Sequence, residues 1–314
     1  MSKVCVVIAV YNGEKYIIEQ LDSIRVQTRQ PDTVIIIDDC SKDNSVTLVS
    51  SYLEKYQLKW NLKIHEKNKG YIETFFEGIN SCADEYIFPC DQDDIWNQNK
   101  IEVMLAEMES HPDCLVLCSD YKLLYEEGSA TARLVPYYFY KKYGKIRKMR
   151  PWIKYTQRII RPGCTFCVRR EIMQYRTKYS LDQEAHDAFF YFISAVKDSL
   201  YVYPEKLILW RRHASNASNR PVPFEKEIWY KKFNCKIALR NLTFFKNECP
   251  TNSRSQRQLE KMLRLNELRA DYFEKHTFFR WVKMIPYFRY FENLFGIFWD
   301  CQWLFAKARR RNDQ

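Results

Sequence analysis

The chain has 314 residues, of which 46% are hydrophobic, and this composition excludes fibrous and disordered proteins because it can build a substantial core. Eleven cysteines, an odd number scattered through apolar runs with no signal-peptide pattern ahead of them, predict reduced thiols in the cytoplasm rather than a disulfide framework. The net charge of +11 is concentrated in residues 224–314, where 19 basic residues stand against 10 acidic ones, and no apolar run reaches the roughly 20 residues that span a bilayer.

Strand-like and helix-like segments alternate through the first third of the chain. Continuous apolar runs that end in polar loops predict strands, and apolar residues that recur every three or four positions predict helices. The expected strands are 4–10, 33–37, 62–65 and 86–89, and the expected helices are 15–27, 43–56 and 71–82. This alternation predicts an α/β fold with a mostly parallel, doubly wound sheet.

The pattern changes in the second half of the chain. A further strand is expected at 115–120, and the stretch 159–169 is β-like with a break at Gly163-Cys164-Thr165. A loop and an aromatic helix that ends at residue 196 follow. After two prolines near residue 222, long helical patterns replace the strand signals. We therefore expect two domains, an α/β domain over 1–222 and a helical, basic and aromatic region over 223–314.

Polar residues follow three of the expected strands at 11–13, 38–41 and 91–94. Ligands bind outside the carboxyl ends of the strands in such sheets, so these residues should converge on one crevice. Asp91 and Asp93 are one residue apart and can face a common site, and hard oxygen ligands suit Mg²⁺ or Mn²⁺. Acidic turns after strands are common, so this pair alone is weak evidence of a metal site.

Three segments become specific when they are considered together. They are VVIAVYNGEKYIIEQLDSIRVQT (6–28), VIIIDDCSKDNS (34–45) and CDQDDIW (90–96). In this combination the chain resembles the family 2 glycosyltransferases, whose GT-A fold has a Rossmann-like sheet, from about residue 3 to about residue 216.

Within that family the likeness is nearest to the bacterial rhamnosyltransferase-like branch that builds cell-surface polysaccharide. That branch has D-Q-D-D-[IV]-W, a later H-D and a Y-R-x-H pattern. Here Trp210 stands where Tyr is common, and Ala188 stands where an aromatic residue often follows H-D. The resemblance implies an inverting, metal-dependent transfer of a sugar, with rhamnose favoured, from a dTDP- or UDP-sugar to a hydroxyl of a glycan or lipid-linked glycan.

The resemblance also implies roles for the carboxylates at the strand ends. Asp93 would be the direct metal ligand, and Asp91 would contact the ribose or a metal-bound water. Asp94 would cap the next helix, expected from about residue 97. Asp39 would accept from the pyrimidine N3–H.

Two further elements are expected around the nucleotide. The backbone from Ala9 to Tyr11 would line the base pocket. Lys69 could lie near the nucleotide, although a lysine in such a loop is more often solvated. An alternative for Asp38 and Asp39 is that they only cap the helix expected over 43–56.

The acceptor side is expected to hold the catalytic base. Inversion in one displacement needs a group that takes the acceptor proton, and the resemblance implies Asp187, with His186 as the other candidate. Alternatively these two residues simply begin a helix. The turn Gly163-Cys164-Thr165 resembles the acceptor-side loop of the family, where little side-chain bulk lets the substrate approach. Cys164 and Cys167 have the spacing of a redox or zinc pair, but without a second pair we interpret them as packing residues.

Three basic residues follow the last expected strand of the α/β domain. Arg211, Arg212 and His213 resemble the segment that folds over the donor diphosphate, where cations would offset the charge of the leaving group. A solvated basic turn is the alternative.

Rival functions fit less well. A nucleotidyltransferase would need a glycine-rich loop after the first strand, which is missing, and residues 224–314 carry no RNA-binding signature, so no nucleic-acid partner is expected. A polyprenyl-phosphate glycosyltransferase and a non-catalytic GT-A protein remain alternatives.

The aromatic residues between 278 and 305, with Arg309–Arg311 behind them, predict an interfacial segment. It would make peripheral contact with the inner face of the plasma membrane and meet a polyprenyl-diphosphate-linked acceptor. Packing against the α/β domain or a second subunit is the alternative, and the oligomeric state stays open.

Overall fold

The computed structural model describes residues 2–126, 145–149, 161–176, 184–213, 216, 224–248, 253–291, 297 and 300. These residues group into two compact units. One contains the described residues up to 149 together with 161–216, and the other contains those from 224 onward. Each unit is described by itself below.

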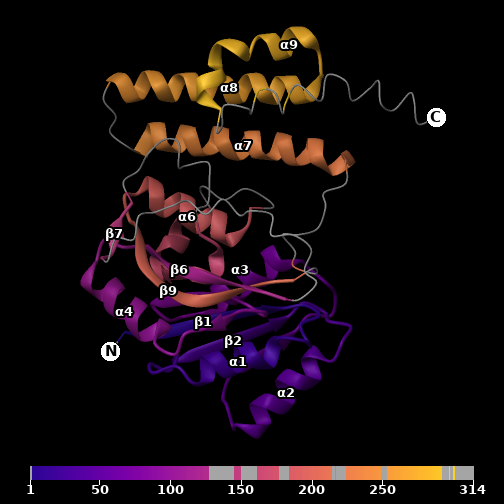
Figure 1. Cartoon of the computed structure of the whole chain (residues 1–314), viewed down its shortest axis with the longest axis vertical. Coiled ribbons are helices and arrows are strands. Elements are labelled where there is room, and N and C mark those ends of the chain that lie inside the picture. Colours follow the sequence, from indigo (N-terminus) through magenta and orange to yellow (C-terminus); the bar gives the residue numbers. More distant parts are fainter. Residues whose placement is uncertain are drawn as a thin grey trace, which may run out of the picture. The chain divides into compact units, whose positions relative to one another are not determined.

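The first unit is built on a mixed sheet that contains nine strands among the described residues (Figure 1). They are β1 (Val4–Val10), β2 (Thr33–Asp38), β3 (Asn61–Ile64), β4 (Tyr86–Asp91), β5 (Ile95–Trp96), β6 (Val116–Tyr125), β7 (Arg147–Lys148), β8 (Phe166–Arg169) and β9 (Leu200–Arg212). The order is β3-β2-β1-β4-β8-β6-β9-β5, and β7 pairs with β9. Only β5, β7 and β8 run against the others, so the prediction of a mostly parallel sheet is confirmed.

Helices cover both faces of this sheet. They are α1 (Ile17–Arg25), α2 (Ser45–Lys55), α3 (Tyr71–Ser81), α4 (Lys100–Ser110) and α6 (His186–Val196). Val6 and Ile8 share a buried cluster with residues of α1, α2 and α4, whereas a Cβ on Gly78 of α3 would meet Val7 and Ile37 on the opposite face. Successive side chains of a strand point to opposite faces, so the almost wholly apolar β1 needs a helix layer on each side.

The strand register brings three polar loops together at one edge of the sheet. Val10 of β1 pairs with Asp38 of β2, and Ala9 pairs with Asp91 of β4. The Asp39 N–H then donates to the Val10 carbonyl over 2.7 Å, which continues the ladder beyond the end of β2. The loops converge, as predicted, because the register aligns the last residues of β1, β2 and β4.

Several expected boundaries were wrong for identifiable reasons. Helix α1 begins at Ile17, not at residue 15, because Asn12 takes a left-handed φ of 50° and the Gly13 carbonyl accepts from the N–H groups of Tyr16 and Ile17. Within the β-like stretch expected over 159–169, by contrast, the expected break is present as the tight turn η2 (Gly163–Thr165), and strand β8 follows it from Phe166 to Arg169. The short strand β5 follows Asp94, so α4 begins later than expected.

The second unit is helical, as predicted. It contains α7 (Phe224–Glu248), α8 (Ser253–Glu274), α9 (Phe278–Val282) and the 3-10 turn η5 (Ile285–Tyr290). Leu265, Tyr272 and Met284 belong to its buried cluster, and the fully buried Asp300 pairs with Arg269 over 2.8 Å. No helix in the described part of the chain is long and apolar enough to cross a membrane.

Candidate active site

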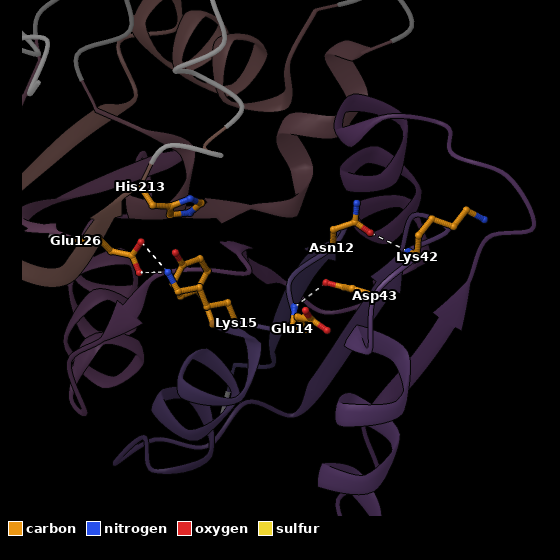
Figure 2. A pocket seen from close by; sticks show the side chains of 8 residues that line it. Asn12, Glu14, Lys15, Lys42, Asp43, Glu126 and His213 are labelled. Carbon is orange, nitrogen blue, oxygen red and sulfur yellow. Dashed lines mark hydrogen bonds and ion pairs between the residues drawn. The ribbon is translucent and has the colours of Figure 1, made fainter. Parts of the chain in front are cut away.

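A hollow of about 570 Å³ opens beside the loop that follows β1 (Figure 2). Figure 2 shows His213 and Glu126 on one side of this hollow and Lys42 with Asp43 on the other. Lys15 pairs with Glu126 over 2.9 Å. The lining residues are Asn12, Glu14, Lys15, Tyr16, Lys42, Asp43, Glu126 and His213. Opposite charges are therefore interleaved around the hollow.

Asp39 is buried at the end of β2 and holds the loop before α3. Its Oδ1 accepts from the Lys69 backbone N–H over 2.7 Å, and its Oδ2 accepts from the Gly70 N–H over 2.8 Å. The Nδ1 of His65 lies 2.9 Å from Oδ1. Asp39 therefore does not cap α2, and Asp38 does not either, because it accepts from Ser41; the helix-cap alternative was wrong.

Two partners of this loop were not predicted. His65 also approaches Glu77, with 3.2 Å between Nε2 and Oε2, and the Lys69 ammonium pairs with the same carboxylate over 2.8 Å. The pKa of Glu77 is lowered to about 2, chiefly by its hydrogen bond with Lys63 and then by that with Lys69. The Lys69 side chain is thus held by α3. A lone histidine after a strand has no sequence signal that distinguishes it from a packing residue.

Gln92, between the two aspartates of the D-x-D pair, joins β4 to the loop after β1. Its Oε1 accepts from the Tyr11 N–H over 2.8 Å, and its Nε2 donates to the Tyr11 carbonyl over 3.1 Å. Both backbone polar groups of Tyr11 are thereby satisfied, while its ring remains 41% exposed. Gly13 leaves room for this amide, since a Cβ there would overlap the Gln92 side chain.

Asp91 and Asp94 form a tight cluster with Cys164. One oxygen of each carboxylate and the Cys164 sulfur all lie within 4.8 Å of one another. The pKa of Asp91 is raised to about 7, first by burial and then by the negative charges of Asp93 and Asp187. Burial likewise raises the pKa of Asp94 and of the Cys164 thiol.

This cluster fits a hard divalent cation. Oδ2 of Asp94 is buried without a hydrogen-bond partner among the described residues, and the like charges that raise the Asp91 pKa would be offset by a cation. Carboxylate oxygens suit Mg²⁺ or Mn²⁺, whereas a protonated thiol is a poor ligand for either. Asp91 is therefore able to hold the ion, with Asp94 beside it and Cys164 as neighbouring packing. Asp93, the ligand expected from the sequence, is not part of this three-residue cluster, but it lies near enough for its charge to raise the Asp91 pKa.

Asp93 is oriented by residues that follow β9. Its Oδ2 lies 2.8 Å from Nε2 of His213 and accepts from Nδ2 of Asn216 over 3.0 Å. Arg211 supports the same turn, because its Nε donates to the Asp93 carbonyl over 2.8 Å and its guanidinium pairs with Glu19. The sequence placed His213 near the diphosphate but gave no sign of its contact with Asp93.

Asp94 does not cap α4, so that expectation was wrong. Its Oδ1 accepts from the Arg211 N–H over 3.0 Å, which ties the D-x-D turn to β9. Below it, Lys100 is fully buried with its ammonium 4.1 Å from the Trp96 ring centroid and 4.7 Å from that of Phe88. Burial lowers the Lys100 pKa to about 8, and Asp94 is among the groups that raise it.

Turn η2 lies between the D-x-D cluster and the expected base. A Cβ on Gly163 would be 2.8 Å from the Asp187 Cβ and 2.8 Å from Nε2 of His186, while the neighbouring Cys164 contacts the cluster. The hydroxyl of Thr165 donates to the Pro162 carbonyl over 2.7 Å and so serves the turn itself. The sequence segments around 91, 163 and 187 thus meet at one place.

His186 and Asp187 occupy different environments at the start of α6. His186 is buried, its ring centroid is 4.0 Å from that of Phe75, and burial lowers its pKa, so the ring is neutral near pH 7. Asp187 is half-buried, and its Oδ1 accepts from the Ala188 N–H over 2.7 Å. This arrangement favours Asp187 as the group that meets an acceptor. The Arg212 guanidinium lies 4.8 Å from the Trp210 ring centroid.

The lining residues Lys15, Tyr16 and Lys42 were missed by the sequence analysis. They lie in segments 6–28 and 34–45, so the motifs did contain them, but exposed lysines have no distinguishing pattern. Tyr16 is placed by its contact with His213, whose ring centroid is 4.6 Å away.

Comparisons with known proteins identify the family to which the chain belongs. The family model described as Glycosyl transferase family 2 matches residues 5–179. The dTDP-rhamnosyl transferase RfbG of Shigella flexneri is 26% identical over 254 residues, which cover 73% of this chain and 83% of that protein. Glycosyltransferase GlyG of Streptococcus pneumoniae is 30% identical over 138 residues, with 44% and 43% of the two chains covered. Matches to uncharacterized mycobacterial proteins, at 29% identity, cover 40% of this chain but only 37% of those chains.

Solved structures share the fold. S. aureus TarS 1-349 superposes with a TM-score of 0.62 at 16% identity, covering 99% of this chain and 92% of that one. The mannosyltransferase PcManGT of Pyrobaculum calidifontis, solved in complex with GDP-Man and Mn²⁺, gives 0.52 at 13% identity, with 98% and 86% covered. At such identities the likeness establishes the GT-A fold expected from the sequence.

Proposed function

Because the chain belongs to glycosyl transferase family 2, we propose that it is an inverting glycosyltransferase that uses Mg²⁺ or Mn²⁺ and a dTDP- or UDP-sugar donor. The observation that carries this proposal is that turn η2 touches Asp91 through Cys164 and Asp187 through Gly163, while the charges of Asp93 and Asp187 both act on Asp91. A cation site and a carboxylate on the acceptor side are the two groups that a single inverting displacement requires.

The pyrimidine base is proposed to bind between Tyr11 and Asp39. The Asp39 carboxylate offers about four acceptor positions, of which the backbone N–H groups of Lys69 and Gly70 and the ring of His65 use three. The remaining position suits the N3–H of uracil or thymine. The exposed ring of Tyr11 supplies a surface for stacking.

The diphosphate is proposed to lie beside Asp93 and His213, over the Asp91 carboxylate. A bound divalent cation supplies electrostatic stabilisation of the negative charge on the leaving diphosphate. The chain's own contribution is to hold Asp93 in place through His213 and Asn216 before the donor arrives. Arg211 is committed to Glu19 and the Asp93 carbonyl, so we assign it to positioning of this turn and not to the phosphates.

Asp187 is proposed to take the proton of the acceptor hydroxyl as that oxygen attacks C1 of the sugar. The neutral, buried His186 is then a packing residue. The glycine at 163 keeps space in front of Asp187 for the acceptor. Rhamnose is the first sugar to test, because the Shigella relative is described as a dTDP-rhamnosyl transferase. The acceptor is proposed to be a glycan or a polyprenyl-diphosphate-linked glycan.

A donor-hydrolysis screen tests the nucleotide, the sugar and the metal together. The purified chain is incubated with dTDP-rhamnose, UDP-hexoses and GDP-hexoses, each with Mn²⁺, with Mg²⁺ and with EDTA. We expect release of dTDP or UDP that depends on the metal. Turnover of GDP-sugars alone would exclude the pyrimidine site, and equal turnover in EDTA would exclude the metal.

A further inference from the structure

The apolar residues between 278 and 291 divide into a set that packs into the helical core and a set that does not. Met284 and Phe291 are buried in the helical core, and Trp281 is anchored to it because its indole N–H donates to the Ile297 carbonyl over 3.0 Å. A second set faces solvent, and we call it the 278–288 surface. Its members are Phe278, Phe279, Val282, Ile285 and Phe288.

The exposure of this surface is large for apolar side chains. Phe279 is 80% exposed and Phe278 is 60% exposed. Both belong to the five-residue helix α9, and Trp281 of the same helix is the residue that packs against the helical core. Scattered single apolar residues are normal on protein surfaces, but five within eleven positions of the chain are unusual. Burial of this surface against another body is therefore favourable.

The charges around the 278–288 surface indicate which kind of binding partner fits it. Arg280, Lys283 and Arg289 are interleaved with the apolar residues, and residues 278–291 contain no acidic residue. Lys283 and Arg289 are exposed, while Arg280 pairs with Asp271 over 3.1 Å. The guanidinium of Arg289 lies 5.6 Å from the Phe288 ring centroid, so cation and aromatic ring occupy the same patch.

We propose that the 278–288 surface docks this protein onto an anionic lipid surface. The phenylalanine rings enter the headgroup layer, and Lys283 and Arg289 meet the lipid phosphates. A second copy of the chain would present the same cations, so its patch would repel this one, whereas an anionic bilayer complements both the charge and the apolar side chains. The proposal rests on the second unit alone and is independent of the proposed function.

Vesicle flotation of the full chain tests this inference. The probes are vesicles of phosphatidylcholine and vesicles in which phosphatidylglycerol replaces part of it. We expect binding to the anionic vesicles that weakens as salt rises, and weak binding to the neutral ones. The Phe278→Ser/Phe279→Ser variant should lose binding by about ten-fold or more. The Lys283→Gln/Arg289→Gln variant should lose roughly five-fold for each cation removed.

A matched control uses two adjacent exposed aromatic residues of the same unit. Trp229 and Tyr230 on α7 are 47% and 44% exposed, so Trp229→Ser/Tyr230→Ser removes similar apolar area elsewhere. This variant should bind as the wild type does. Equal binding to both vesicle types, or equal loss in the control, would overturn the proposal. A dimer in solution that only the Phe278/Phe279 variant dissociates would show that a second copy covers the surface instead.

Discussion

Replacement of Gly163 by alanine tests whether turn η2 positions the acceptor against Asp187. The new Cβ would lie 2.8 Å from the Asp187 Cβ and 2.8 Å from Nε2 of His186. Non-bonded carbon atoms reach their optimal separation at about 3.5–4.0 Å, so Asp187 must move by roughly 0.7–1.2 Å. A displacement of about 1 Å at a reacting group can cost about 10²-fold in rate. We therefore expect Gly163→Ala to lower kcat for transfer by about two orders of magnitude.

The donor site gives the internal control for this variant. The three atoms nearest to the new methyl group all belong to His186 and Asp187, not to Asp39, Gln92 or Asp93, so donor affinity measured by calorimetry should stay within about two-fold. Gly78→Ala is the matched glycine variant, since its Cβ would overlap Val7 in the core. It should lower the free energy of unfolding by about 1–3 kcal/mol, as overpacking does, and leave the rate per folded molecule unchanged.

Wild-type transfer by Gly163→Ala, with donor affinity also unchanged, would contradict this reasoning. It would mean that the position of Asp187 does not control the reaction. Loss of donor affinity in the same variant would show instead that the turn supports the D-x-D cluster through Cys164.

Three further predictions concern the carboxylate cluster. Asp93→Ala should abolish metal-dependent nucleotide binding in calorimetry. Asp187→Asn should retain that binding but lower the rate of transfer by about two to four orders of magnitude. Near wild-type transfer by Asp187→Asn would make His186 the next residue to test. The raised pKa of Asp91, about 7, means that the folded protein keeps a proton that the unfolded chain loses above about pH 4. In EDTA the free energy of unfolding should therefore fall as pH rises from about 4 to 7, by up to about 4 kcal/mol, and urea titrations should show a smaller fall for Asp91→Asn. Lys100→Met removes a buried cation whose pKa is lowered to about 8 and leaves the buried Asp94 without that charge, so it should weaken donor binding in calorimetry. An unchanged donor affinity would show that Lys100 is only a packing residue.

The sheet could be predicted because its signal is local. Apolar runs that end in Tyr11–Gly13, Asp38–Ser41 and Asp91–Asp94 identify both the strands and the edge at which ligands bind, and parallel pairing then brings these ends together. The motif residues at that edge were found for the same reason. Their roles came from the resemblance to a family and not from the spacing alone.

The rest of the site depends on contacts between distant parts of the sequence. His213 and Asn216 meet Asp93 across more than a hundred residues, and Asp94 bonds to the backbone of Arg211 across a similar interval. No periodicity in the sequence reports such contacts. The error about Asp94 shows this: a carboxylate ahead of a helix usually caps it, but here β5 intervenes and pairs with β9. The burial of an aromatic residue also depends on distant contacts: Trp281 is partly buried against the helical core, whereas Phe279, two residues earlier, is 80% exposed.

These long-range contacts explain how two neighbouring carboxylates acquire different tasks. Asp93 has one oxygen occupied by His213 and Asn216, which leaves the other oxygen with a fixed direction. Asp94 is bound through one oxygen to the Arg211 N–H and is buried beside the Lys100 ammonium, so it is held inside the fold. Burial, and after it the negative charges of Asp93 and Asp187, raises the pKa of Asp91. A cation held by Asp91 and Asp93 would offset the repulsion between their negative charges. Because the same cation would contact the donor diphosphate, the binding of metal and the binding of donor should each strengthen the other.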